Sequence, residues 1–264
     1  MKKYYIYIIG IAAALFTACE NISEDERFLE VEGVTAQRVV LLEDYTGQGC
    51  LNCPNAHDVA TQLHEAYHDN LIVVSMHAGM LAYPYPDGLK QPEGDAYATA
   101  AGVEFYPSGM VNRRGGLLDN YLSWSGAVYN ELQRESQVQL TVNANLSSDS
   151  ILSVNVDMIA LAAISGKLQL WIVEDSIIAM QKLPTGKYDP KYVHNHVFRG
   201  AINGTWGEDI SLTLGEEKTK CHNDFELNAV WKPENLSVVA FIYNNNDGVL
   251  QAAQCNVNLG NIDE

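Results

Sequence analysis

The pattern of hydrophobic and polar residues changes character near Ser136. Before that point, apolar runs of strand length alternate with segments in which apolar residues recur at helical spacing. After it, short stretches of alternating apolar and polar residues follow one another, parted by Ser, Asn, Asp and Gly. The pattern therefore predicts an α/β domain over residues 36–136 and an all-β domain over residues 137–264.

The first half predicts the order β-α-β-α-β-β-α. Its expected strands are Val39 to Leu42, Leu71 to Gly79 and Ser108 to Arg113, and helical segments follow Cys53, Asp95 and Asp119. The second half predicts seven strands, typical of an antiparallel sandwich of immunoglobulin-like type. These strands are expected at residues 138–146, 151–161, 167–177, 209–214, 220–230, 236–244 and 249–259.

The N-terminus carries an export signal. Lys2 and Lys3 precede an apolar run from Tyr4 to Phe16, which is too short to span a membrane as a mature helix. The segment ends in Leu-Phe-Thr-Ala-Cys, which resembles a bacterial lipobox and implies that Cys19 carries the lipid and anchors the protein to a membrane. We predict a signal peptide over residues 1–18 and an acidic tether over residues 19–35.

Composition limits the partners. The formal net charge is −17, so a polyanion such as nucleic acid is not expected to bind. A hydrophobic content of 47% over 264 residues is enough to fill two cores.

Cys50 and Cys53 form a CxxC motif between a predicted strand and a predicted helix. Cysteines at this spacing share one helix face, and the first turn of a helix favours a thiolate. Cys50, nearer the helix end, is the expected attacking sulfur, and Cys53 would resolve the mixed disulfide. A static disulfide and half of a zinc site remain as alternatives.

The motif and its surroundings resemble the thioredoxin superfamily. In that family an acid stands six residues before the first cysteine, where this chain has Asp44, and the resemblance implies that this acid moves protons for Cys53; Glu43 is the alternative inward-pointing acid. The segment Gly102 to Gly116 looks like the family's cis-proline loop. The resemblance further implies Pro107 as the cis-proline and Tyr106 as its substrate-holding neighbour. His77, at the end of the next expected strand, is placed to reach the cleft and tune the thiols or relay protons, and an ordinary structural histidine is the alternative. Gln48-Gly49 and Pro54 depart from the family pattern.

The remaining cysteines, Cys221 and Cys255, predict a structural disulfide in an exported chain, and two separate buried thiols are the alternative. The segment from His64 to His68 is a formal HExxH, which makes a zinc hydrolase a minor alternative. No downstream third ligand accompanies it, and a metal pair of His194 with His196 is a further alternative. We therefore expect no metal and no organic cofactor.

Taken together, the lipobox, the CxxCP segment, Pro107 and the segment HNHVFRG resemble the Omp28-related outer-membrane lipoproteins. This resemblance implies an outer-membrane lipoprotein with a thioredoxin-like module, facing the periplasm or the cell surface, for which redox and adhesin-like roles are both conceivable. The resulting hypothesis is a lipid-anchored thiol-disulfide oxidoreductase that acts on the thiols or disulfides of exported proteins. The alternative is a surface binding or adhesion lipoprotein whose CxxC is a static disulfide.

Overall fold

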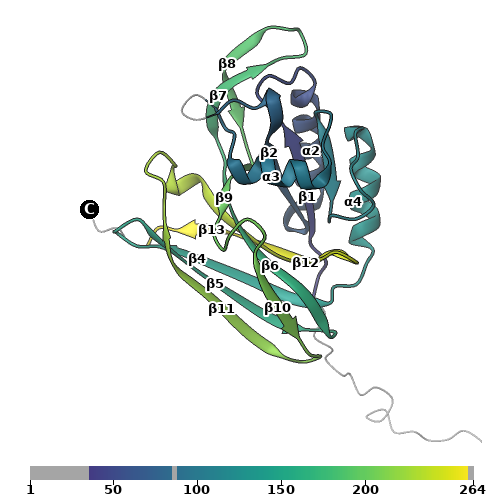
Figure 1. Cartoon of the computed structure of the whole chain (residues 1–264), viewed down its shortest axis with the longest axis vertical. Helices are drawn as coiled ribbons and strands as arrows, with labels where there is room; N and C mark the ends of the chain where they lie inside the picture. Colours follow the sequence, from purple (N-terminus) through teal and green to yellow (C-terminus); the bar gives the residue numbers. More distant parts are fainter. Residues whose placement is uncertain (1–35, 85–87, 261–264) are drawn as a thin grey trace, which may run out of the picture. The chain divides into compact units, whose positions relative to one another are not determined.

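The computed structural model describes residues 36–84 and 88–260 (Figure 1). The predicted signal peptide, the lipidation site Cys19 and the acidic tether lie outside the described residues, so these stay predictions. None of the helices within 36–84 and 88–260 combines the length and the apolar character needed to cross a bilayer.

The described residues form three α-helices, four short 3₁₀ helices and thirteen strands (Figure 1). The helices are α2 (Cys53–Tyr67), α3 (Pro92–Ala101) and α4 (Trp124–Leu132). The strands are β1 (Val40–Thr46), β2 (Leu71–His77), β3 (Ser108–Val111), β4 (Val138–Leu146), β5 (Ile151–Ala160), β6 (Ile164–Glu174), β7 (Ile177–Lys182), β8 (Tyr188–His194), β9 (Val197–Ala201), β10 (Glu208–Leu212), β11 (Glu217–Glu226), β12 (Leu236–Asn244) and β13 (Gly248–Asn258).

Eleven of these strands belong to one sheet, and this corrects the predicted fold class. The strand order is β11-β5-β4-β13-β12-β6-β9-β2-β1-β3, with β10 paired to β6. The prediction of an α/β thioredoxin-like domain followed by a separate immunoglobulin-like sandwich is therefore wrong: strands from both halves of the sequence form a single β-rich sheet with few helices. The remaining strands, β7 and β8, form a hairpin of their own that projects beyond the sheet (Figure 1).

The two halves of the sequence join where β2 meets β9. Strands β1 and β2 run parallel, and Ser75 of β2 pairs with Val197 of β9, also in parallel. The backbone N–H of Ser75 donates to the carbonyl of His196 at 2.7 Å. The junction in the sheet is short, so side-chain packing must supply most of the adhesion between the two halves.

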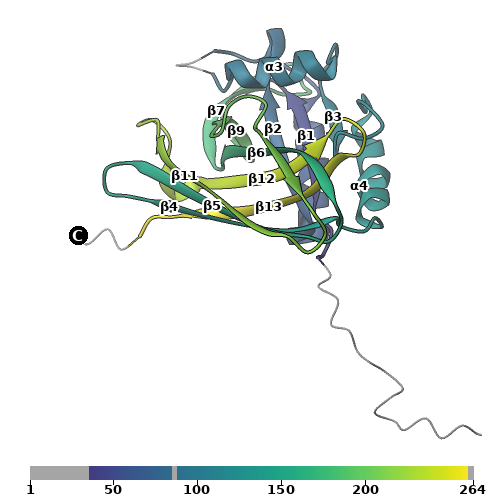
Figure 2. The same ribbon diagram turned by 60° about the horizontal axis from the view of Figure 1, so that its bottom comes forward.

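That packing comes from strands whose two faces are both buried. On β6, Leu170 and Ile172 face one hydrophobic core, whereas Trp171 and Val173 face another. Successive residues of a strand point to opposite sides, so one strand can serve two cores. The second core also receives side chains from β1, β2, α3, β12 and β13, and it joins the two halves of the chain. Figure 2 shows β6 and β12 lying between the strands of the first half and the layer of β4, β5 and β11.

A third core lies beneath the helices. Val40 and Leu42 of β1 and Val73 of β2 pack there against α2 and against Trp124 of α4. The alternation along β1 therefore assigns Leu41, Glu43 and Tyr45 to the second core, and Val40, Leu42, Asp44 and Thr46 to the side covered by α2. This assignment decides where the acid at the end of β1 is placed.

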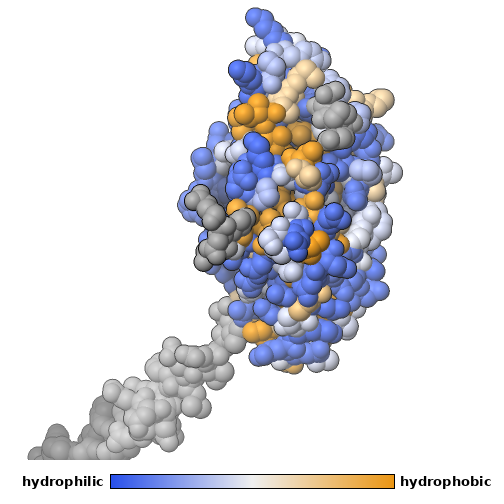
Figure 3. Space-filling model, turned by 90° about the vertical axis from the view of Figure 1, so that its left-hand side faces the viewer, coloured by the Kyte–Doolittle hydropathy of each residue, from blue (hydrophilic) through white to orange (hydrophobic). Residues whose placement is uncertain are grey.

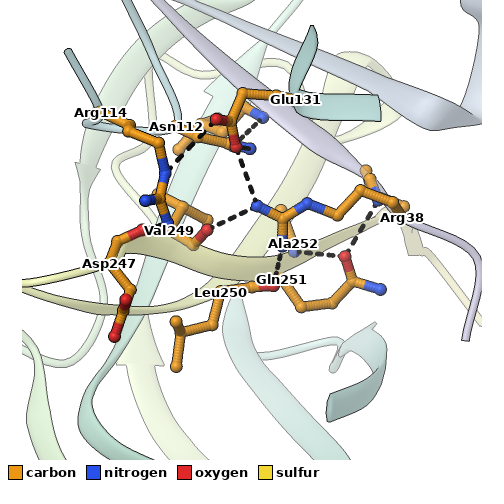
Figure 4. Close-up of polar contacts among 11 residues, drawn as sticks. Arg38, Asn112, Arg114, Glu131, Asp247, Val249, Leu250, Gln251 and Ala252 are labelled. Carbon is orange, nitrogen blue, oxygen red and sulfur yellow. Dashed lines mark hydrogen bonds and ion pairs between the residues drawn. The ribbon is translucent and has the colours of Figure 1, made fainter. Parts of the chain in front are cut away.

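A buried polar cluster also ties α4 to the two halves of the sheet (Figure 4). Glu131 accepts from Arg38 Nη2 at 3.2 Å and from Asn112 Nδ2 at 3.0 Å, and its other oxygen lies 3.3 Å from Arg114 Nε. Arg38 also donates to the carbonyl of Val249 at 2.8 Å, on β13. This carboxylate therefore supplies the counter-ion of the buried Arg38 and also contacts the partly exposed Arg114.

The division of the chain at residue 136 stays a prediction, although strands from both sides of it share the sheet. The disulfide predicted between Cys221 and Cys255 is not formed, because both thiols are free. Cys221 lies on β11 and Cys255 on β13, with β5 and β4 between them. Strands lie about 4.8 Å apart, so the two cysteines are separated by about three such steps, beyond the reach of a disulfide.

Replacing Glu131 by Ala should destabilise the protein by about 3–5 kcal/mol, because Arg38 would stay buried without its counter-ion. Urea unfolding followed by circular dichroism measures the change. The matched control is Glu135→Ala, on the exposed surface one turn further on, which should change stability by no more than about 0.5 kcal/mol. Equal stabilities for the two variants would contradict this account of the cluster.

Candidate functional site

The predicted CxxC forms a disulfide where the chain turns from β1 into α2. Cys53 is the first residue of α2, and the Cα atoms of Cys50 and Cys53 lie 5.4 Å apart. Pro54 occupies the first turn, where its missing N–H needs no partner. The backbone N–H of Cys53 donates to Cys50 Sγ at 3.1 Å, a contact that would also stabilise a Cys50 thiolate.

The loop before the disulfide is held from two sides. Gly47 has no room for a side chain, because a Cβ there would come within 2.6 Å of the backbone of Leu81. On the other side, Gln181 of β7 donates to the carbonyl of Cys50 at 3.0 Å, and the N–H of Lys182 donates to the carbonyl of Gln48 at 2.8 Å. The side chain of Gln48 donates in turn to the carbonyl of Met180 at 3.1 Å.

These contacts place the β7-β8 hairpin over the disulfide. Cys50 is 2% exposed and Cys53 is fully buried. Leu51, between them, is exposed, as are Ile178 and Val193 of the hairpin. The face that carries the hairpin displays a group of hydrophobic side chains (Figure 3). Both sulfurs are therefore inaccessible to a guest peptide in this conformation, in which the hairpin is hydrogen-bonded to the loop that carries Cys50.

Asp44 takes the inward position that the sequence predicted for it. It is fully buried on the α2 side of β1, and neither carboxyl oxygen has a hydrogen-bond partner. The alternative acid, Glu43, faces the opposite side and accepts from Arg113 Nε at 2.7 Å and from the Tyr45 hydroxyl at 3.1 Å. Glu43 is therefore a paired structural acid, and Asp44 is the unpaired one.

Burial raises the pKa of Asp44 to about 8, because an apolar environment disfavours the charged form. The carboxyl is consequently mostly protonated at neutral pH. A carboxyl with this property can take up and release a proton near pH 7, which a paired surface carboxylate cannot do. Cys53 would need such a group each time that it lost or gained its own proton.

His57 connects Asp44 to the hairpin. Its Nε2 atom lies 3.7 Å from Oδ2 of Asp44 and 2.9 Å from the hydroxyl of Thr46. Its Nδ1 atom lies 3.0 Å from the hydroxyl of Tyr192, on β8. Burial lowers the pKa of His57 to about 3, with His194 and His196 contributing, so the ring is neutral at pH 7.

Four histidines line one cavity of about 280 Å³ beside this chain of contacts: His57, His77, His194 and His196. The rings of His77 and His194 lie 5.2 Å apart, and none of their nitrogens has a hydrogen-bond partner. Burial lowers the pKa of His194 to about 4 and the pKa of His77 well below its ordinary value. His77, which the sequence placed at the cleft, therefore lies inside the molecule and faces the hairpin.

The peptide bond between Tyr106 and Pro107 is cis, as the resemblance implied. Tyr45 of β1 pairs with Ser108 of β3, so the register places Pro107 beside Thr46, at the end of β1 that leads to the cysteines. Pro107 is buried, and Tyr106 packs against Gly79, where a Cβ would come within 2.3 Å of the tyrosine hydroxyl. Their role in holding a substrate stays a prediction.

The alternative zinc site does not have the geometry that an HExxH motif needs. Helix α2 ends at Tyr67, and His68 has a φ of 49°, so His64 and His68 do not share a regular helix face. His64 Nδ1 lies 2.9 Å from the carbonyl oxygen of Leu71. Among the residues that the structure describes, no group of three His, Cys, Asp or Glu side chains is arranged to hold a metal.

Two residues of the site, His57 and Tyr192, were missed by the sequence analysis. His57 stands four residues after Cys53, a spacing that places both on one helix face, and this signal was available. Tyr192 comes from 139 positions further along the chain than Cys53, and no local pattern indicates that contact.

The pH dependence of stability should reveal Asp44. The pKa of its carboxyl is raised in the folded state, so folding favours the protonated form, and stability is lost as pH rises from about 4 to about 8. Asp44→Asn removes this loss. The free energy of unfolding of Asp44→Asn should exceed that of the wild type by a margin that grows by about 1.4 kcal/mol per pH unit across that window, as measured by urea unfolding. Asp58→Asn, on the exposed face of α2, is the control and should run parallel to the wild type.

The buried histidines should act in the opposite direction. The pKa of His77 is lowered in the folded state, so stability is full above about pH 6.5 and is lost as pH falls below it. His77→Phe removes the group, so the acid-induced loss of stability should shrink by about 1.4 kcal/mol per pH unit below pH 6.5. Urea unfolding at pH 7.5, 6 and 5 measures this, with exposed His68→Asn as control. An unchanged acid slope in His77→Phe would rule out this role of burial.

Comparisons with solved structures establish the fold. HBP35 of Porphyromonas gingivalis is 14% identical, with a TM-score of 0.71, and the match covers 87% of this chain and 79% of that one. A structural-genomics target from Agrobacterium tumefaciens is 16% identical, with a TM-score of 0.55, over 87% of this chain and 98% of that one. A domain of the outer membrane lipoprotein Omp28 from Porphyromonas gingivalis is 22% identical over 47% of this chain and 90% of that one, with a TM-score of 0.33.

No curated protein matches the chain. Residues 94–260 match the family described as outer membrane protein Omp28, which is well over half of the sequence. The match includes Pro107 and the HNHVFRG segment but begins after Cys50 and Cys53. It confirms the predicted family and the predicted location at the outer membrane. The chain therefore belongs to the Omp28 family of outer membrane proteins.

Proposed function

We propose that Cys50 and Cys53 exchange disulfides with exported proteins at the outer membrane. The observation that carries the proposal is Asp44, a carboxyl buried without a hydrogen-bond partner and facing His57 of α2, the helix that begins at Cys53. Burying an unpaired carboxyl destabilises a fold, and structural needs alone do not account for it. Perturbed and unpaired acids concentrate at functional sites.

The chemistry follows from the order of the two cysteines. The Cys50 thiolate attacks one sulfur of a substrate disulfide, forms a mixed disulfide with it and releases the other substrate sulfur as a thiolate. Cys53 gives its proton to ionised Asp44 and attacks Cys50 Sγ, so that the second substrate sulfur leaves. The Cys50–Cys53 disulfide has then formed, and two electrons have passed to the substrate. The reverse sequence oxidises a substrate dithiol.

The burial of Cys50 sets a requirement for any substrate, which must reach a sulfur that the free protein does not expose. The hydrogen bonds of Gln181 and Lys182 to the cysteine loop have to break before a guest sulfur can approach. A substrate that binds the exposed apolar side chains of the hairpin could provide the compensating free energy. Compact folded proteins expose few such segments, so incompletely folded exported proteins fit this requirement best.

The second candidate is a binding lipoprotein in which the disulfide is permanent. The observation that favours it is the burial of both sulfurs under the hairpin. In that case the disulfide would fix the start of α2, and the exposed apolar side chains of the hairpin would contact a partner.

A redox titration separates the two candidates. Cys221 is exposed and would also react with thiol probes, so the titration uses a Cys221→Ser, Cys255→Ser background, in which only the CxxC pair can titrate beyond residue 35. The free thiols of Cys50 and Cys53 are then tagged and counted by mass. We expect a potential above about −300 mV and catalysis of disulfide reshuffling in a test protein whose disulfides have been scrambled.

The matched variants are Cys50→Ala and Cys53→Ala in the same background. Cys50→Ala should lose reshuffling entirely, whereas Cys53→Ala should accumulate the mixed disulfide with the test protein. A potential below about −300 mV without reshuffling activity would mark a permanent bond and would favour the binding lipoprotein.

A further inference from the structure

Asp44 has no hydrogen bond of its own through which it could exchange protons with water. It is fully buried, so a proton that it received from Cys53 would remain trapped unless a neighbouring group passed it on. The groups that face it, or face its neighbour His57, come from four elements. They are Thr46 of β1, His57 and Asp58 of α2, His77 of β2, Tyr192 and His194 of β8, and His196 after β8.

Among the described residues, His57 is the group that lies within 4 Å of both the acid and a side chain of the hairpin. The Nε2 atom of His57 lies 3.7 Å from the Asp44 carboxyl, and its Nδ1 atom lies 3.0 Å from the Tyr192 hydroxyl. An imidazole can accept a proton at one nitrogen while it releases another from the second. The Tyr192 hydroxyl, which both donates and accepts, lines the cavity of about 280 Å³.

We infer that His57 and Tyr192 form a proton relay between Asp44 and the histidine-lined cavity. The inference rests on the proposed thiol-disulfide exchange. The carboxyl proton of Asp44 passes to His57 Nε2, the Nδ1 proton passes to the Tyr192 oxygen, and the tyrosine releases its own proton to water in the cavity. Asp44 is left ionised and ready to accept the proton of Cys53, and no electrons move in these steps.

The ionisation behaviour of the three groups suits this role. The pKa of Asp44 is raised to about 8, so the carboxyl can both give and take a proton near neutral pH. Burial lowers the pKa of His57 to about 3, so the ring does not hold a proton that passes through it. Burial, with Asp58 and Asp44, raises the pKa of Tyr192 to about 12, so its hydroxyl stays protonated at neutral pH.

The relay also links proton transfer to the cover over the disulfide. Tyr192 belongs to the same hairpin whose other strand holds the cysteine loop through Gln181. A movement of the hairpin that uncovers Cys50 would separate Tyr192 from His57. His57 and Tyr192 are therefore positioning residues that act through Asp44, and they do not contact the sulfurs themselves.

The test uses the full chain in the Cys221→Ser, Cys255→Ser background, with the variants Tyr192→Phe and His57→Gln. The first readout needs no activity: the Asp44 carboxyl is followed by infrared spectroscopy in the disulfide form after transfer into D₂O, and Asp44→Asn identifies its band. We expect the hydrogen–deuterium exchange of this carboxyl to slow at least about tenfold in both variants, a modest part of what general acid–base groups contribute. His64→Gln, on the same helix and outside these contacts, is the control and should exchange like the wild type.

The second readout is the rate at which the dithiol form is oxidised by hydroxyethyl disulfide between pH 5.5 and 9. We expect the resolving step in the wild type to speed up as rising pH ionises the Asp44 carboxyl, and Tyr192→Phe to be slower by at least about tenfold at pH 7. Adding Tyr192→Phe to Asp44→Asn should bring no further loss, because the relay acts only through the acid.

The outcomes separate the relay from the function. Slower carboxyl exchange in Tyr192→Phe and His57→Gln supports the relay, whether or not the wild type exchanges disulfides. A wild type without disulfide exchange would contradict only the proposed function. Carboxyl exchange at the wild-type rate in both variants overturns the relay, whether or not the cysteines are active. Additive losses in the double variant would likewise exclude a path through Asp44.

Discussion

The burial of the Asp44 carboxyl without a partner is the constraint around which the site is built. A charged carboxylate in this position would be strongly disfavoured, so the group stays protonated and its pKa rises to about 8. His57 carries no charge beside it, and the histidines of the adjoining cavity are neutral as well. The site is therefore polar but almost uncharged, which suits proton movement better than ion binding.

The fold places this acid by simple alternation along one strand. Glu43 and Asp44 are adjacent in sequence and point to opposite faces of β1. Glu43 meets Arg113, whose guanidinium also lies 4.5 Å from the centre of the Tyr243 ring and is thereby held in an aromatic surrounding. Asp44 faces α2, where Nε2 of His57 lies 3.7 Å from its carboxyl. One acid consequently stabilises the core that joins the two halves of the chain, and the other remains available for chemistry.

The elements themselves could be predicted from the sequence, but their assembly could not. The strand before the CxxC and the strand from Leu71 lie where local patterns indicated, and the cis bond at Pro107 lies where the family resemblance implied it. The runs Leu170 to Val173 and Val238 to Ile242 are apolar without alternation, and such runs indicate strands buried on both faces. That signal distinguishes them from the alternating β4 and β5, but it does not indicate which strands lie beside them.

The site was predictable in part for the same reason. Cys50, Cys53 and Asp44 are close in sequence, and the resemblance to the thioredoxin superfamily singled out this acid. Tyr192 and Gln181 reach the cysteine loop from a hairpin about 130 residues away, and their contacts depend on tertiary packing. The error over Cys221 and Cys255 has the same origin, because counting cysteines says nothing of how many strands separate them.

The most direct test of the account is the pKa of the Asp44 carboxyl, measured by ¹³C NMR in the disulfide and dithiol forms. The account predicts a value near 8 in the disulfide form, because the carboxyl is buried and unpaired. It also predicts a different value in the dithiol form, because the carboxyl then shares its surroundings with an ionisable Cys53. A value near 4 that is the same in both forms would contradict it.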